Sequence, residues 1–355
     1  MNRAWPLLAP FSLLYGGASA LRNLMYDRGV RPSHETGVAV LSVGNLTAGG
    51  SGKSPLTQAL AANLRDLAPD LPIVVVSRGY GRRTHGAQVV ADGANVLLTP
   101  DLGGDEPVMI AEALGNVPVI VSERRVEGVA LAVEQFGAKM IVLDDAFQHR
   151  AIGRDLDVVL LDASEPDWIW RPLPAGRLRE LPQGLKRADL LVITGEASAQ
   201  RKEQLVDFVR RFSEAEIVEG HAVLSHLKSH ETGEQQPLEA LEGKRVAAAC
   251  AIARPERFFH AIEECGAEIV YRKAWRDHSW TTRDQRDTFM GRAMNAGAEV
   301  ALITAKDAVK WPRSEEGLPI LVPELGWKWH GDGDAMDGIL ARFVETAHER
   351  SILHQ

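Results

Sequence analysis

A glycine-rich stretch, TAGGSGKSP at residues 47–55, contains the residue types that hold phosphate. It follows an apolar run at 38–43 and precedes a helix-like stretch at 56–67. Backbone N–H groups of such a loop can bind phosphate oxygens, and the dipole of the following helix favours their negative charge. The spacing predicts that Lys53 reaches the β- and γ-phosphates of a nucleotide and that the Ser54 hydroxyl binds Mg²⁺. The expected nucleotide-binding residues are Thr47, Gly49, Gly50, Ser51, Gly52, Lys53 and Ser54.

The first position of this loop departs from the usual pattern. Phosphate-binding loops of this type begin with glycine, whereas this one begins with Thr47. The adjacent Gly49 and Gly50 supply backbone freedom nearby. The alternative is a glycine-rich turn with a solvated lysine. The position between a strand and a helix favours the nucleotide loop.

Acidic residues follow a second apolar run, in MIVLDDAFQHR at 140–150. A P-loop kinase needs a carboxylate at the end of a neighbouring strand to hold Mg²⁺, directly or through water. Asp144 and Asp145 meet this need, and Gln148 and His149 after them indicate a dense metal and phosphate site. The alternatives are a strand-end cap for Asp144 and a rival acid, Asp162, which lacks such polar neighbours. The expected metal ligands are Ser54, Asp144, Asp145 and Gln148.

Two further segments carry charged residues beside glycines. SRGYGRR at 77–83 follows an apolar run, and its arginines could hold an anionic substrate, the alternative being a solvated turn. GGDEP at 103–107 places Asp105 directly before a helix expected from 107. Capping a helix is a common use of Asp, and a functional carboxylate is the other interpretation of this residue.

Short apolar runs rich in Val and Ile alternate with helix-like stretches up to residue 194. The expected strands are 38–43, 73–77, 117–122, 140–145, 157–162 and 190–194, and the expected helices are 56–67, 107–114 and 126–136. Continuous apolar strands alternating with helices indicate a parallel sheet that is covered on both faces. The predicted fold class is α/β, a P-loop kinase-like parallel sheet with helices on both faces, plus a second smaller α/β domain.

The length of 355 residues corresponds to about two domains. We expect an N-terminal helix in 1–30 and a nucleotide-binding domain in 31–220. A polar linker or hairpin is expected in 221–240, a second α/β domain in 241–330 and a C-terminal helix in 331–355.

Composition and charge exclude several classes of protein. The net charge of −8 argues against a nucleic-acid binder with a generally basic surface. Two cysteines, Cys250 and Cys265, cannot build a disulfide framework or a metal site, so we expect both to be reduced.

The N-terminal segment has an apolar stripe at helical spacing, followed by Arg22 and Arg28. The stripe consists of Phe11, Leu14, Tyr15, Ala18, Leu21 and Met25. Pro6 and Pro10 interrupt the run, which is too short for a confident membrane span. Two interpretations remain, a helix lying on a membrane surface and a helix packed on the core of the protein.

Taken together, these segments resemble the tetraacyldisaccharide 4'-kinase family of Gram-negative bacteria. The resemblance runs from the N-terminal helix to about Lys310. Its motifs, specific in their order and spacing, are SVGNLTAGGSGKSP, SRGYGRR, GGDEP, LDDAFQHR, DLDVVLLDA, LPAGRLRE, RADLLVITG, RDHSWT and TAKDAVK. The loop of that family also tolerates Thr at its first position. Departures from the family pattern are Ala251, Ser279 and Ala305.

The resemblance implies transfer of the γ-phosphoryl group of ATP, with Mg²⁺, to the 4'-hydroxyl of a tetraacyldisaccharide 1-phosphate. It implies two α/β domains with the active site between them and a C-terminal helix packed on the first. The lipid substrate lies at the cytoplasmic face of the inner membrane, which favours membrane contact by the N-terminal stripe, as a peripheral or monotopic protein. Neither a nucleic acid nor a protein partner is expected.

The resemblance also implies roles for individual residues. Asp105 would accept the proton of the sugar hydroxyl with His278 as its partner, while Lys53 holds the phosphates. The implied substrate-binding residues are Arg78, Tyr80, Arg125, His149, Arg179 and Glu180.

Two other functions remain as alternatives. One is a P-loop GTPase or metallochaperone-type switch, although Lys306 lies directly beside Asp307 in TAKD, which is the wrong spacing for a guanine site. The other is a non-catalytic, membrane-associated ATP-binding protein.

Overall fold

The computed structural model describes residues 5–50, 52–277, 279–312, 317–331 and 334–353. Two residues with predicted roles, Ser51 and His278, lie outside the described residues.

The first part of the chain forms a mainly parallel sheet around the strand that leads into the glycine-rich loop. This strand, β1 (Ala39–Asn45), lies between β5 (Met140–Leu143) and β6 (Leu156–Asp162), parallel to both. Beyond β5 the order is β2 (Ile73–Ser77), β4 (Val119–Val121) and the antiparallel edge strand β3 (Gln88–Ala91). Beyond β6 come β7 (Leu190–Thr194) and the long β8 (Glu216–Ser229). The carboxyl ends of the parallel strands therefore share one edge, where ligands bind in such sheets.

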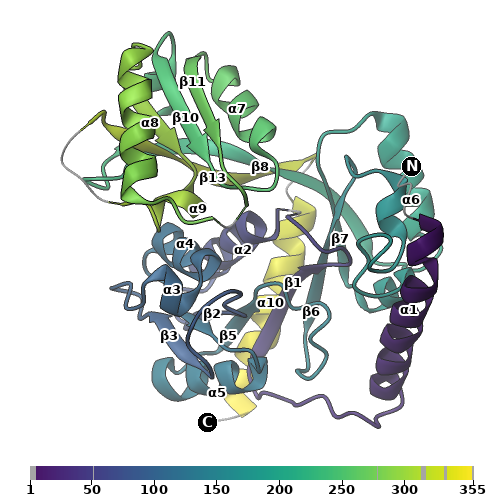
Figure 1. Ribbon diagram of the computed structural model, residues 1–355. Helices are drawn as coiled ribbons and strands as arrows, with labels where there is room; N and C mark the ends of the chain where they lie inside the picture. The colour runs from purple at the N-terminus through teal and green to yellow at the C-terminus, as the bar shows by residue number, and fades with distance from the viewer. Residues whose placement is uncertain (1–4, 51, 278, 313–316, 332–333, 354–355) are drawn as a thin grey trace.

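The second part of the chain continues the same sheet. Its strands are β10 (Arg245–Cys250), β11 (Glu268–Ala274), β12 (Val300–Ile303) and β13 (Ile320–His330), with the short β9 (Gln235–Gln236) paired to β8. β13 pairs antiparallel with β8, and these two long strands pass between the two parts of the molecule (Figure 1). The predicted linker at 221–240 thus contains the second half of a strand.

Helices cover both faces of the sheet, which confirms the predicted fold class. In the first part α2 (Lys53–Leu67), α4 (Asp105–Leu114) and α10 (Asp334–Leu353) pack on one face. The other face carries α5 (Arg125–Phe136) and α6 (Ala199–Val209). In the second part α7 (Pro255–Glu264) and α8 (Arg283–Asn295) cover opposite faces. Both cysteines are free thiols, and burial raises the pKa of Cys250 to about 12.

Short elements complete the chain and correct some predicted boundaries. They are α3 (Pro100–Gly103), α9 (Ala305–Ala308) and 3₁₀ turns at Asp167–Trp170, Pro182–Arg187 and Leu238–Leu241. Helix α4 begins at Asp105 rather than at 107, and its cap is Gly104, whose φ of 91° favours glycine. Asp105 is therefore the first residue of the helix and not its N-cap.

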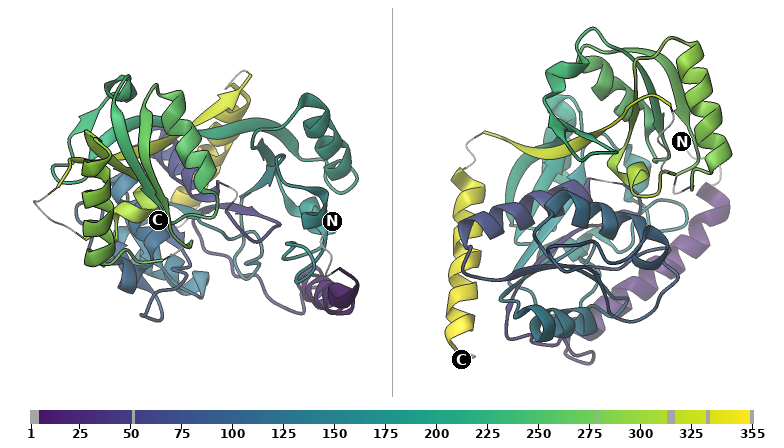
Figure 2. Two further views of the ribbon diagram at one scale, coloured as in Figure 1. Left: turned by 45° about the horizontal axis from the view of Figure 1, so that its top comes forward. Right: turned by 90° about the vertical axis from the view of Figure 1, so that its left-hand side faces the viewer.

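The N-terminal helix α1 (Trp5–Asp27) lies at one margin of the molecule (Figure 2). Small residues face the protein, because Ser12 and Ser19 are buried. Large apolar residues face outward, with Leu13 and Leu14 each 74% exposed and Phe11 62% exposed. The predicted stripe is therefore not packed on the core. Among the described residues, no helix combines the length and apolar character needed to cross a membrane.

Candidate active site

The glycine-rich loop connects the end of β1 to the start of α2. Gly52 precedes the helix in a left-handed conformation, with φ of 84°, and Gly49 has φ of 119°. Both values disfavour residues with a Cβ atom. The Lys53 ammonium donates a hydrogen bond to the Gly49 carbonyl (3.3 Å) and lies 3.6 Å from an Asp145 carboxylate oxygen. The loop lysine and the acid after β5 therefore meet at the edge of the sheet.

The two adjacent aspartates have opposite environments. Asp144 is buried and accepts hydrogen bonds from the Thr57 and Ser77 hydroxyls (3.1 and 2.9 Å). Burial, followed by the charge of Asp145, raises the pKa of Asp144. The sequence did not predict these two contacts, because Thr57 and Ser77 reach Asp144 only when α2 and β2 pack beside β5.

Asp145 lies in a turn with unusual backbone geometry. Its φ of 46° is the one positive value among the described non-glycine residues, a strained conformation that often marks a functional site. Arg179 donates to both Asp145 carboxylate oxygens (2.8 and 2.9 Å). Burial would raise the pKa of Asp145, but the charges of Lys53 and Arg179 outweigh it and lower this pKa. The carboxylate is thus held ionised beside the phosphate loop.

Arg125 fixes this turn from inside the protein. Its side chain is buried and donates to the carbonyls of Ser122 (3.1 Å) and Asp144 (3.2 Å). Burial lowers the pKa of Arg125 to about 10, which still leaves it charged near neutral pH. The predicted contact of Arg125 with substrate stays a prediction, and in this structure its guanidinium is enclosed and binds backbone carbonyls.

Asp105 lies where the two parts of the molecule meet. Its carboxylate is 3.3 Å from the Lys310 ammonium, and Lys306 lies 3.7 Å from Glu106. Both lysines come from the TAKDAVK segment at the start of α9, four residues apart. Lys306 also reaches Asp277 (3.3 Å), the residue before His278. The sequence contained this lysine spacing but gave no indication of its partners.

The environment of Glu106 disfavours its ionised form. Burial is the main cause and the charge of Asp144 is the next, and together they raise the pKa of Glu106. The side chain nevertheless keeps some access to solvent. Two acids of the first part thus approach two lysines of the second.

The loop after β2 has one arginine that is buried in an ion pair and another that is exposed to solvent. Arg82 is buried and pairs with Glu123 (2.7 Å), whereas Arg78 is exposed and Tyr80 is 74% exposed. A Cβ atom on Gly104 would lie 3.2 Å from the Cα of Gly79, so the loop packs directly against the turn before Asp105. Arg78 and Tyr80 are therefore accessible to a ligand.

His149 lies among cationic side chains. Burial and then the charges of Arg125, Arg154, Arg78 and Arg22 lower its pKa to about 4. The imidazole is consequently neutral near pH 7 and can accept or donate a hydrogen bond to a polar ligand.

Gln148 and Glu180, both predicted to contact a ligand, are hydrogen-bonded to each other. The Gln148 side-chain amide donates to the Asn45 carbonyl (2.8 Å) and to Glu180 (3.0 Å) through its nitrogen. Glu180 is fully buried and accepts hydrogen bonds from Arg187 (2.9 and 3.0 Å) and Asn23 (2.6 Å). These contacts hold both side chains in place beside the site. Arg187 begins the RADLLVITG motif, whereas Asn23 lies 157 residues from Glu180, so the sequence gave no indication of that contact.

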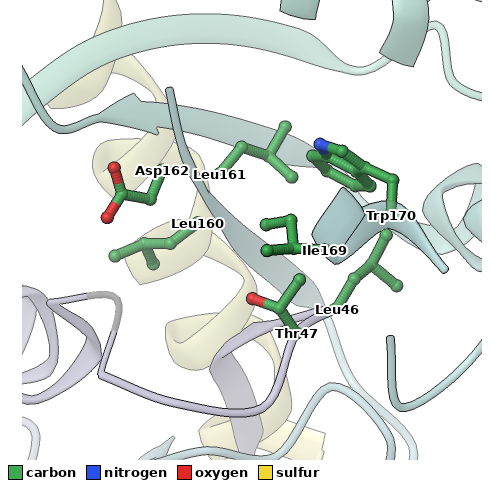
Figure 3. Close-up of a pocket in the computed structure, with 7 residues that line it drawn as sticks. All are labelled: Leu46, Thr47, Leu160, Leu161, Asp162, Ile169 and Trp170. Atoms are coloured by element: carbon green, nitrogen blue, oxygen red, sulfur yellow. The ribbon is translucent and has the colours of Figure 1, made fainter. Parts of the chain in front are cut away.

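The rival acid Asp162 has a different partner. It lines a small, mostly apolar pocket with Thr47, Leu160 and Trp170 (Figure 3). Arg254 from the second part donates to it (3.0 Å) and also to Glu165, so a second ionic contact joins the two parts here. This pairing leaves Asp144 and Asp145 as the better candidates for a metal.

Comparisons with known proteins give one consistent family. The family model described as tetraacyldisaccharide-1-P 4'-kinase matches residues 4–342. A tetraacyldisaccharide 4'-kinase of Anaeromyxobacter dehalogenans strain 2CP-C is 41% identical over 86% of this chain and 80% of its own. The enzyme of that name from Chlorobaculum tepidum is 39% identical over 91% of each chain.

A solved structure shares the fold. The crystal structure of the "apo" form of LpxK from Aquifex aeolicus, in complex with ATP, has a TM-score of 0.76 and 29% sequence identity to this chain. The similarity covers 95% of this chain and 98% of the other.

Proposed function

The chain belongs to the tetraacyldisaccharide-1-P 4'-kinase family, and on that premise we propose how its residues perform the reaction. The enzyme is an ATP-dependent kinase of lipid A biosynthesis that phosphorylates the 4'-hydroxyl of tetraacyldisaccharide 1-phosphate. The observation that carries the assignment of roles is the approach of Lys53 in the loop to Asp145 after β5, at 3.6 Å. This arrangement supports a site in which phosphate-binding and metal-binding groups meet.

The phosphates of ATP would lie in the loop between β1 and α2. The backbone N–H groups from Gly49 onward and the N-terminus of α2 bind phosphate oxygens. Lys53 exchanges its contacts with Asp145 and the Gly49 carbonyl for the β- and γ-phosphates. Because the ammonium is mostly enclosed, its attraction to the phosphates is stronger there than in water.

The donors present fit Mg²⁺. Ser54, Asp144 and Asp145 supply the hard oxygen atoms that this ion prefers. The raised pKa of Asp144 fits a carboxylate that gains from a nearby cation. In the described parts of the chain no set of three or more His, Cys, Asp or Glu side chains is arranged around a metal. Mg²⁺ does not require one, because it keeps waters and uses phosphate oxygens. Once bound, it would neutralise charge on the β- and γ-phosphates.

Asp105 would act as the general base. Its carboxylate oxygen takes the proton of the 4'-hydroxyl, the sugar oxygen bonds to the γ-phosphorus, and the bond to the β–γ bridging oxygen breaks to release ADP. The Lys310 ammonium at 3.3 Å favours the ionised carboxylate, the form that accepts a proton. The family resemblance supplies His278 as its partner, and Asp277, the preceding residue in the sequence, reaches Lys306.

The acceptor would be held by the accessible residues Arg78, Tyr80 and His149. Arg179 orients Asp145, while Arg125 and Glu180 support the site from within. A hydroxyl and a phosphoryl group held in line gain most of their rate from positioning.

The outward face of α1 would bind the cytoplasmic face of the inner membrane. Leu7, Leu13 and Leu14 are each at least 74% exposed, and a concentration of exposed large apolar residues on one helix marks an interaction site. A helix with such a face lies in the membrane interface. Replacing Leu13 and Leu14 together by Ser should move the protein out of the membrane fraction, as measured by vesicle sedimentation. Unchanged sedimentation would show that another surface docks.

The direct test of function incubates the purified protein with labelled ATP and tetraacyldisaccharide 1-phosphate. A labelled bisphosphorylated lipid is the expected product. ATP binding without product would favour the non-catalytic alternative, and a preference for GTP would favour the switch.

A further inference from the structure

The cationic surroundings of His149 include Arg22, an arginine that the catalytic scheme does not use. Four guanidinium groups act on this imidazole, those of Arg125, Arg154, Arg78 and Arg22. Arg125 binds backbone carbonyls, and Arg154 pairs with Asp157 at 2.9 Å. Arg78 belongs to the accessible loop after β2. Arg22 comes from α1, far from the other three in sequence.

Arg22 has the polar atoms of a ligand-binding residue without a ligand. Its Nε and Nη2 atoms are buried, and within the described part of the chain neither has a hydrogen-bond partner. Arg125 also has a buried Nε without a partner, but its other two nitrogens are hydrogen-bonded. A buried N–H group without a partner is costly, more so on a charged group, so an unpartnered guanidinium implies an anion that completes it.

The helix that carries Arg22 is firmly attached to the site. Ser12 accepts a hydrogen bond from the Ala175 backbone (3.0 Å), and the Asn23 side chain donates to Glu180 (2.6 Å). Arg150 donates to the Asn23 carbonyl (2.9 Å) and pairs with Asp27 (2.7 Å). These contacts bracket Arg22 on both sides, so its position does not depend on the apolar face of α1.

We propose that Arg22, together with His149 and Arg78, binds the phosphomonoester that the acceptor already carries, the 1-phosphate of the lipid disaccharide. This inference rests on the proposed function, since that function supplies an acceptor with a phosphate at the end remote from the reacting hydroxyl. Arginine suits the group because its planar fork forms two charge-assisted hydrogen bonds to phosphate oxygens. The phosphates of ATP have their own ligands in the loop and Lys53.

The arrangement gives α1 two tasks on opposite faces. Its outward apolar side chains contact the lipid surface. Arg22, on the side facing the protein, binds the 1-phosphate of the lipid acceptor. An acceptor without the 1-phosphate would leave Arg22 unpaired, and a site built for a charged partner discriminates strongly against a substrate that lacks it.

The test compares acceptors with and without the 1-phosphate in neutral detergent micelles, which removes any effect of anionic lipid. Wild type should prefer the phosphorylated acceptor. Arg22→Met should lower kcat/KM for that acceptor about 10-fold or more, the size expected for a lost charge-assisted hydrogen bond. It should leave kcat/KM for the other acceptor nearly unchanged. The control is Arg28→Met, at an exposed arginine six residues further along and just beyond the end of α1, which should keep the wild-type preference.

A second measurement separates ligand binding from a structural role. Arg22→Met should leave the melting temperature of the ligand-free protein unchanged or raise it, because the variant removes unpaired buried N–H groups. Arg22→Lys should restore part of the preference. If Arg22→Met lowers kcat/KM for both acceptors equally, or if it keeps the preference of wild type, the proposal is wrong.

Binding of small anions shows which kind of phosphate Arg22 binds. It also tests the inference when the proposed function is wrong. Glucosamine 1-phosphate should raise the melting temperature of wild type and not of Arg22→Met. An equal shift from inorganic phosphate would identify free phosphate as the ligand and overturn the acceptor assignment. If wild type phosphorylates neither acceptor, the proposed function fails. The glucosamine 1-phosphate result then decides the inference alone. An equal rise in the melting temperatures of wild type and Arg22→Met would overturn it.

Discussion

The phosphate-binding side of the site and its base-bearing side are built in different ways. Lys53, Asp145 and Arg179 all come from the first part of the chain. Lys53 follows the loop after β1 and Asp145 follows β5, while Arg179 lies in the segment between β6 and β7. Asp105, in contrast, meets Lys310 from the second part across 3.3 Å. One side is assembled by the local sheet, and the other exists only when the two parts are correctly placed. ATP binding should therefore tolerate changes that stop transfer.

The sharpest test of this contrast is Lys53→Ala. Removing the ammonium should lower the single-turnover rate by about 10³-fold or more, because preorganised charge is the main source of phosphoryl-transfer catalysis. ATP affinity should fall as well. Lys244→Ala, at an exposed lysine of the second part, serves as the control. A nearly wild-type rate in Lys53→Ala would remove the loop from the mechanism.

Asp105→Asn should separate chemistry from ATP binding. The variant should lose about 10²-fold or more in single-turnover rate, since general bases contribute this much, and should keep its affinity for ATP. His278→Ala should cause similar but smaller damage. If the two residues act as one unit, the double variant should be little worse than Asp105→Asn alone. Effects that multiply independently would exclude the pair.

Lys310→Met examines the contact between the parts. Its ammonium is almost fully enclosed beside Asp105, so its loss should leave the carboxylate less well positioned and lower the rate about 10-fold. The pH needed for half-maximal activity should rise, because a nearby cation favours the ionised carboxylate. The acid limb of the pH–rate profile of kcat/KM provides the measurement. A loss of rate without any shift of that limb would mean that Lys310 only holds the two parts together.

Arg254→Ala examines the second ionic contact, which has no reacting group. Arg254 binds Asp162 and Glu165 across the boundary and is partly exposed. We expect less than about a 10-fold effect, chiefly on KM for ATP, because partly exposed ion pairs contribute little energy. An effect as large as that of Asp105→Asn would show that closure here controls the chemistry.

The smallest expected effect concerns stability at acid pH. The pKa of His149 is about 4 in the folded protein against an ordinary value of 6.5. Between these values the unfolded chain binds more protons, so stability is lost as pH falls from about 6.5 to about 4. His149→Gln should flatten this loss, as measured by urea unfolding at pH 5 and pH 7.5. Equal slopes in both proteins would contradict the depressed pKa.

Two predicted residues show that a sequence pattern can locate a side chain without giving its hydrogen-bond partners. Gln148 and Glu180 lie in motifs of the site, where Gln148 donates to Glu180 and Glu180 is buried against Arg187. A motif records which residues a site requires but not whether they touch the ligand or hold those that do. Direction depends on packing between segments that are distant in sequence.

The sequence alone determined the local geometry of the site. Apolar runs of Val and Ile specified the buried strands, and glycines beside Lys53 specified a loop that only small residues can form. The pair Asp144–Asp145 could be placed because parallel strands end at a common edge. These features depend on residues close together in the chain, where propensity and spacing are informative.

Tertiary structure alone decided which charges are paired. Lys310 reaches Asp105 over a separation of 205 residues, and Asn23 on α1 reaches Glu180 over 157. The sequence gives Arg22 only as a residue beside an apolar stripe, whereas the docking of α1 buries two of its guanidinium nitrogens. Long side chains of like charge are equivalent in a sequence. Burial and the position of a distant partner make them different, because the energy of a charge depends on its surroundings.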